Sequence, residues 1–121
     1  RNGKAVIQTI TIDDNLFDSY KNSTDAIRTC IFPGGMIPSQ KRCSKYACNN
    51  GFKVLDKFSF GDSYAKTLDI WHETFKSNLE DVKKLKFDEK FIRLWEYYLT
   101  SCSSSFTNER TNVYQFTLQK T

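Results

Sequence analysis

The chain has 121 residues, a formal net charge of +4, and a composition that is 39% hydrophobic and 15% aromatic. That length suits one small domain, and the ten Phe, six Tyr and two Trp supply a folded core, which argues against disorder. The longest apolar runs are only a few residues, which excludes a bilayer-spanning segment, and no signal-peptide pattern opens the chain.

The first part of the chain predicts a strand, a helical connection, a loop and a short helix. Residues 5–12 are rich in β-branched side chains and predict a strand, and their apolar side chains on both faces predict a central place in an α/β sheet. Residues 13–30 predict a polar helical connection. Residues 31–39 contain two prolines and two glycines and predict a rigid loop. Ser39 is the expected N-cap of a short helix that ends at residues 49–51.

The second part predicts a strand, two helices and a last strand. Residues 52–60 alternate and predict a strand with one better-buried face. A long amphipathic helix follows and is expected to break at residues 86–87. Asp88 is the expected N-cap of a second helix, which residues 103–105, all serine, are expected to fray. Residues 113–119 alternate strongly and predict the last strand. This order indicates an α/β fold that is incomplete.

The four cysteines do not have the paired short spacings of a zinc site, and the chain holds a single histidine. A disulfide framework is typical of secreted mini-proteins without a core of their own. We therefore expect no metal, and we expect reduced thiols that are mostly buried.

Five basic residues gather near the expected junction of the two long helices: Lys83, Lys84, Lys86, Lys90 and Arg93. One interpretation is an ordinary solvated surface. Another is attraction to anionic phospholipid headgroups, to which each basic residue near the surface contributes about 1 kcal/mol. No recognised nucleic-acid-binding motif accompanies the charge, so no nucleic-acid partner is expected.

Four segments form a pattern in order and spacing. They are Gln8-Thr9-Ile10; Ile31-Phe32-Pro33-Gly34-Gly35 with Pro38-Ser39; Gly61-Asp62-Ser63-Tyr64 with Thr67-Leu68 and Trp71; and Trp95-Glu96-Tyr97-Tyr98-Leu99 with Cys102. Together they resemble the cyclopropane-fatty-acyl-phospholipid synthase family of lipid methyltransferases, over nearly the whole chain.

The resemblance implies the C-terminal portion of a Rossmann-like class I methyltransferase fold, with three strands and covering helices. In such sheets the last strand lies antiparallel between the two before it. Residues 1–121 would then be the C-terminal part of a single methyltransferase domain whose cofactor-binding N-terminal half is absent. The chain starts at Arg1, and no glycine-rich loop follows a strand in it. We therefore expect none of its residues to bind S-adenosylmethionine.

The activity implied by the resemblance is transfer of a one-carbon unit from S-adenosylmethionine to the double bond of an unsaturated phospholipid acyl chain. The product is a cyclopropane or a methyl or methylene branch. The enzyme would be cytoplasmic and peripheral to the inner membrane face, and a homodimer is open. Two alternatives are a methyltransferase acting on another small lipid, and a non-catalytic lipid-binding or interaction module.

Site residues follow from the same resemblance. Tyr64, Gln8 and the backbone of Ile10 match positions that hold a bicarbonate, the expected base, and Tyr64 and Cys102 match catalytic positions. Gln8 stands where the family usually keeps histidine; its amide donates a hydrogen bond but carries no charge and shuttles no proton. This leaves ring closure less secure than methyl or methylene transfer. Cys102 lies on the apolar stripe of its helix, where a thiol is more often inert packing.

The acyl-pocket candidates are Phe32, Gly34, Trp71, Trp95 and Tyr98. Aromatic faces stabilise positive charge that develops on an acyl chain. The alternative for each aromatic residue is ordinary core packing at helical spacing.

Overall fold

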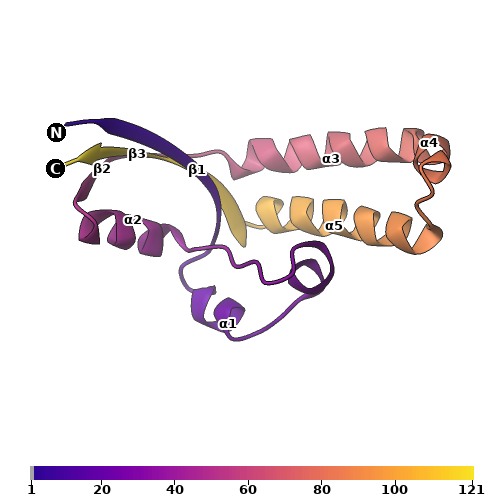
Figure 1. The fold of residues 1–121 in the computed structure, drawn as a ribbon, viewed down its shortest axis with the longest axis horizontal. Helices are drawn as coiled ribbons and strands as arrows, with labels where there is room; N and C mark the ends of the chain where they lie inside the picture. The colour runs from indigo at the N-terminus through magenta and orange to yellow at the C-terminus, as the bar shows by residue number, and fades with distance from the viewer. Residues whose placement is uncertain (1) are drawn as a thin grey trace.

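The computed structural model describes residues 2–121, and its three strands form one sheet in the order β1-β3-β2 (Figure 1). β1 spans Lys4–Ile12, β2 spans Phe52–Ser59 and β3 spans Thr111–Lys120. β3 is antiparallel to both neighbours, with Ile10 opposite Val113 and Phe58 opposite Gln115. The expected insertion of the last strand between the other two is confirmed, and so is the α/β class.

β1 lies at the edge of this sheet, and the expectation of a strand buried on both faces is wrong for residues 2–121. Its second edge is unpaired in that range, apart from a single bridge between Ile12 and Ser39. Val6 is 65% exposed, and Ile7, on the opposite face, is 50% exposed. The apolar residues are present, but only Ile12, which is 2% exposed, is covered by the elements described.

β2 forms where expected, but its predicted single buried face is wrong beyond the middle of the strand. Val54 pairs with Leu118 and Asp56 pairs with Thr117, so Leu55 is an extra residue that forms a bulge. A one-residue insertion moves every later side chain to the other face. As a result Phe58, assigned to the same face as Val54, is 57% exposed.

The connection after β1 is two short helical pieces rather than one helix over residues 13–30. α1 spans Phe17–Lys21, and the π-helical turn η1 spans Ile27–Ile31. The Arg28 guanidinium donates to the carbonyl oxygens of Tyr20 and Ser23, and Asp25 accepts from the Arg28 backbone N–H. These side-chain bonds satisfy backbone groups that a continuous helix would use.

The loop and short helix before β2 agree with the sequence. α2 spans Gln40–Asn49, and the Ser39 hydroxyl caps it by accepting from the Arg42 N–H at 3.3 Å. Gly51 follows the helix with a φ of 75°, a conformation that favours glycine. α2 packs against β2 and covers one face of the sheet (Figure 1).

α3 and α5 form a long helical hairpin beside the end of the sheet (Figure 1). α3 spans Gly61–Ser77, α4 spans Leu79–Lys84 and α5 spans Glu89–Thr107. One of the two core clusters described lies between the hairpin and β3 and is made of Ala65, Leu68, Leu99, Phe106 and Val113. No helix among residues 2–121 has the length and apolar character needed to cross a membrane.

The hairpin differs from the sequence prediction in two places. The first helix already ends at Ser77, and its C-cap Asn78, whose side-chain amide donates to the Thr74 carbonyl at 2.7 Å, leads into α4. The expected break at Lys86 is also present, with a φ of 68°. Asp88 caps α5 as predicted, at 2.8 Å from the Phe91 N–H. The three serines do not fray α5, because Ser103 is buried and donates to the Ala65 carbonyl.

Candidate functional site

An open apolar groove of about 410 Å³ lies between α3 and α5. Its lining is mostly aromatic and aliphatic: Trp71, Thr74, Phe75, Asn78, Trp95, Tyr98 and Leu99. Three of the five acyl-pocket candidates, Trp71, Trp95 and Tyr98, therefore lie in one concave surface. A groove of this size and composition is suited to an apolar ligand.

Aromatic rings extend the groove along α5 in a continuous row, called here the aromatic row: Phe87, Phe91, Trp95, Tyr98 and Phe32. Successive ring centroids are 4.3, 5.6, 5.1 and 5.8 Å apart. Phe32, the fourth acyl-pocket candidate, meets Tyr98 edge to face. Gly34 does not line the groove; it has a φ of 78° and shapes the turn that carries Phe32.

Tyr64 lies on the first turns of α3, between the groove and the sheet. Its ring meets Trp71 edge to face at 6.2 Å and Phe106 at 5.2 Å. The Tyr64 hydroxyl makes no hydrogen bond to any side chain or backbone group of the part of the chain described. The ring is fixed by packing while its hydroxyl remains available as a donor.

Gln8 and Ile10 lie on neighbouring positions of one face of β1. Ile10 is opposite Val113, and Val113 belongs to the core cluster against which Tyr64 packs. Gln8 is further along the sheet, where its side-chain oxygen accepts from the Gln115 amide at 3.0 Å. The structure therefore links Ile10 to the surroundings of Tyr64, whereas Gln8 is engaged with β3 and keeps only its own N–H groups as donors.

Cys102 is half-buried and packs against the core cluster, one helical turn beyond Tyr98. Burial, followed by the nearby Asp25 carboxylate, raises the pKa of the Cys102 thiol to about 11. Burial also raises the pKa of Tyr98, with smaller effects of Cys102 and Tyr64. A thiol with so high a pKa is protonated at neutral pH and is a poor nucleophile.

The four cysteines show no disulfide within residues 2–121, and the expectation that they are mostly buried is wrong. Cys30 and Cys48 are exposed, and Cys43 and Cys102 are half-buried. Burial and the neighbouring Asp14 carboxylate raise the pKa of Cys43.

We expect alkylation of Cys102 by iodoacetamide to accelerate only as the pH approaches about 11, well above its ordinary pKa of 9.0. Between these values the folded protein keeps a proton that the unfolded chain has released. Stability from this group is therefore complete below pH 9.0 and is lost as the pH rises toward about 11. Mass spectrometry of the modified peptides measures the rate, with the exposed Cys30 as internal standard. An inflection for Cys102 below pH 9.0 would contradict the assignment.

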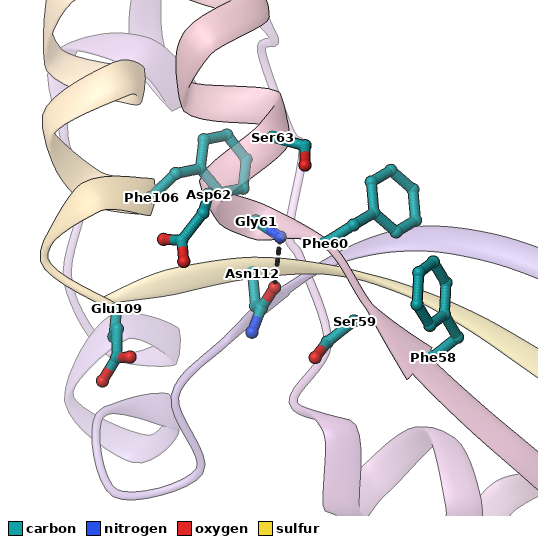
Figure 2. Close-up of a pocket in the computed structure, with 9 residues that line it drawn as sticks. All are labelled: Phe58, Ser59, Phe60, Gly61, Asp62, Ser63, Phe106, Glu109 and Asn112. Atoms are coloured by element: carbon teal, nitrogen blue, oxygen red, sulfur yellow. Dashed lines mark hydrogen bonds between the residues drawn. The ribbon is translucent and has the colours of Figure 1, made fainter.

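A second cavity, of about 300 Å³, lies where β2 ends and α3 begins (Figure 2). Its lining combines two carboxylates, two hydroxyls and an aromatic wall: Phe58, Ser59, Phe60, Gly61, Asp62, Ser63, Phe106, Glu109 and Asn112. Sequence reasoning missed it, because Glu109 and Asn112 come from the other end of the chain. The one available signal was the Gly61-Asp62-Ser63 turn directly after a strand.

Strand-to-helix junctions of this kind carry the glycines that bind the cofactor in Rossmann-like folds. A Cβ atom on Gly61 would lie 2.6 Å from the Asn112 side-chain oxygen. The close approach of Asn112 therefore accounts for the glycine at this position. The glycine gives no sign of a cofactor cradle at this junction.

Asn112 instead holds the junction together. Its side-chain oxygen accepts from the Gly61 N–H at 2.9 Å and from the Val113 N–H at 2.8 Å (Figure 2 shows the first bond). Asn112→Ala leaves both donors without this acceptor, and we expect it to lower the free energy of unfolding by about 1–3 kcal/mol. Chemical denaturation measures this loss. Asn112→Asp keeps an acceptor oxygen and is expected to recover most of it; an equal loss in both variants would contradict this role.

The family described as mycolic acid cyclopropane synthetase matches residues 1–116. The chain is 34% identical over 117 residues to the tuberculostearic acid methyltransferase UfaA1 of Mycobacterium tuberculosis, covering 96% of this chain and 27% of that protein. It is 32% identical over 127 residues to cyclopropane mycolic acid synthase 2 of Mycobacterium bovis, covering 98% of this chain and 42% of that protein.

Two solved structures share the fold. The cyclopropane synthase MmaA2 from Mycobacterium tuberculosis superposes with a TM-score of 0.87 at 26% identity, over 98% of this chain and 45% of that chain. Mycolic acid cyclopropane synthase CmaA1 complexed with SAH and CTAB superposes with a TM-score of 0.86 at 31% identity, with the same coverage. The chain thus spans less than half of the length of each of these proteins.

Proposed function

Because the chain belongs to the mycolic acid cyclopropane synthetase family, we propose that it is part of an S-adenosylmethionine-dependent methyltransferase acting on the double bond of an unsaturated acyl chain. The names of its relatives refer to tuberculostearic acid and to mycolic acid. We further propose that the acyl chain is carried by a phospholipid, and that the product is a cyclopropane or a methyl or methylene branch.

The groove between α3 and α5 is the observation that carries this proposal. It is open at the surface and lined mainly by Trp71, Phe75, Trp95, Tyr98 and Leu99. An acyl chain lying there would bury part of its apolar surface against these side chains. The aromatic faces would also stabilise positive charge developing at the double bond.

No glycine-rich loop of the kind that holds S-adenosylmethionine follows a strand in residues 1–121. S-adenosylmethionine supplies the methyl group, and we propose that another part of the protein holds it. Residues 1–121 would then be the C-terminal part of a single methyltransferase domain and would supply the lipid side of the active site. The family membership and the coverage of less than half of each relative support this division.

We propose that the Tyr64 hydroxyl contacts the anion that acts as the base. Its ring is clamped between Trp71 and Phe106, and its free hydroxyl would donate to a small anion such as bicarbonate that accepts the proton leaving the substrate. The backbone of Ile10 and the amide of Gln8 would complete the anion site. Gln8 remains neutral, so it would help to hold the anion without taking the proton itself.

Cys102 would serve this site by packing and not as a nucleophile. Its pKa of about 11 keeps the thiol protonated near neutral pH. Its place against the core cluster, one turn from Tyr98, is a structural reason for a small apolar side chain there.

The proposal is tested by incubating the full-length protein that contains this chain with S-adenosylmethionine labelled in its methyl group. Vesicles of an unsaturated phospholipid are the substrate, and a saturated phospholipid with the same headgroup is the control. We expect label in the unsaturated lipid alone. Equal labelling of the saturated lipid would contradict transfer to a double bond, and binding of either lipid without transfer would favour a lipid-binding module. Label in an unsaturated mycolic acid but not in phospholipid would contradict the phospholipid substrate, while it would support transfer to a double bond.

A further inference from the structure

The turn between α4 and α5, residues 85–88, is called here the tip. It lies at the end of the molecule opposite to both termini (Figure 1). Lys86 has a φ of 68°, which reverses the chain sharply. On either side of it the turn exposes two large apolar side chains. Leu85 is 72% exposed and Phe87 is 44% exposed.

The four carboxylates around the tip are all engaged within the protein. Three of the carboxylates there form ion pairs: Glu80 and Glu89 with Lys83, at 3.8 and 3.3 Å, and Asp81 with Lys84 at 2.8 Å. Asp88, the fourth, accepts the Phe91 backbone N–H as the helix cap.

Three cations then remain without an acidic partner in residues 2–121: Lys86, Lys90 and Arg93, all exposed. The tip therefore offers two exposed apolar side chains next to three free positive charges. This combination matches the boundary of a lipid bilayer, where acyl chains lie beneath negatively charged headgroups.

The tip is also continuous with the groove. Phe87 begins the aromatic row, and its ring lies 4.3 Å from Phe91, which in turn stacks on Trp95 in the groove wall. An apolar path thus runs along α5 from the exposed tip to the groove.

We propose that the tip docks onto a membrane that contains anionic phospholipid. Leu85 and Phe87 insert among the acyl chains, and Lys86, Lys90 and Arg93 contact the headgroup phosphates. The aromatic row then leads an acyl chain from the membrane to the groove. Only this last step rests on the proposed function; the docking does not.

Flotation of the full-length protein with vesicles tests the docking. One set of vesicles is phosphatidylcholine alone, and the other also contains phosphatidylglycerol. We expect Lys86→Gln/Lys90→Gln to weaken partitioning onto the anionic vesicles by about 30-fold, since each basic residue near the surface contributes about 1 kcal/mol. Leu85→Ser/Phe87→Ser is expected to weaken it by at least about tenfold through the loss of apolar insertion.

Matched variants elsewhere on the chain serve as controls. Lys45→Gln/Lys66→Gln removes two exposed charges on α2 and α3, and Ile70→Ser removes an apolar side chain that is 64% exposed on α3. Both are expected to bind anionic vesicles like the unmodified protein. Equal binding by the tip variants, equal loss in the control variants, or equal partitioning onto neutral and anionic vesicles would each overturn the proposal.

Activity separates a failure of docking from a failure of the proposed function. On a monomeric short-chain unsaturated lipid, below the concentration at which it forms micelles, Lys86→Gln/Lys90→Gln is expected to retain the unmodified rate. On anionic vesicles it is expected to lose activity in step with its binding. Normal vesicle binding without methyl transfer to any lipid would reject the proposed function and leave the docking intact. Equal activity of this variant and the unmodified protein on vesicles would reject the docking.

Discussion

Replacing Tyr64 with phenylalanine is expected to lower kcat for one-carbon transfer by about 100- to 1,000-fold, the usual effect of removing one hydrogen-bond donor from a charge-stabilising site. The phenylalanine ring keeps the edge-to-face contacts with Trp71 and Phe106. KM for the lipid is expected to change little, because in the proposed site the hydroxyl would contact the anion and not the acyl chain. Steady-state kinetics of the full-length enzyme measure both constants.

Tyr97→Phe is the matched control for this prediction. Tyr97 lies on α5, is exposed, and does not line the groove. Loss of its hydroxyl is expected to leave kcat unchanged. A Tyr64→Phe enzyme that retains the unmodified kcat would show that this hydroxyl takes no part in the reaction, and the anion site would then have to be placed elsewhere.

Replacing Leu68 with alanine is expected to lower the free energy of unfolding by about 2–5 kcal/mol, the range for removing a buried leucine side chain from a packed core. Leu68 is 1% exposed and lies at the centre of the cluster that joins α3 to α5 and β3. A cavity there loosens the same helix pair that forms the groove. Urea denaturation of the full-length protein measures the change.

Ile70→Ala, two positions along α3, is the control. Ile70 is 64% exposed, and a change there is expected to alter stability by no more than about 0.5 kcal/mol. A Leu68→Ala loss as small as that of Ile70→Ala would contradict the placement of the core between the hairpin and β3.

Local signals in the sequence predicted the strands and helix caps well. Ser39 and Asp88 cap their helices through short-range bonds to residues three positions on, which depend on little beyond the local chain. The order of strands in the sheet followed from the family resemblance, because periodicity gives no information about which strands are neighbours.

The errors arose where tertiary contacts decide the outcome. The bulge at Leu55 is fixed by pairing with β3, and no local pattern announced it. Ser103 stays inside α5 because its hydroxyl donates a hydrogen bond to the facing helix α3, where the Asp69 carboxylate lies at 2.5 Å and the Ala65 carbonyl at 3.3 Å. The sequence does carry a local signal for the early end of α3. Asn78 is a weak helix former, and its side chain bonds to the Thr74 carbonyl.

The candidate site was predicted in part. The family resemblance suggested Trp71, Trp95 and Tyr98 as acyl-pocket residues, and these three do line one groove. Helical spacing alone was equally consistent with ordinary core packing. The cavity beside Gly61 was missed, because its walls come from residues about fifty positions apart that only the sheet brings together. The free positive charges at the tip could not be predicted from the sequence, because only the structure shows which basic residues there form ion pairs.

The position of the transferred carbon tests the central claim most directly. The full-length protein is incubated with S-adenosylmethionine and an unsaturated phospholipid, and the acyl chains are released and analysed by mass spectrometry and proton NMR. The account predicts an acyl chain heavier by one CH₂ group, with loss of the original pair of alkene protons and with ring or branch signals that identify the product. A headgroup that gains the carbon while the acyl double bond remains intact would contradict it.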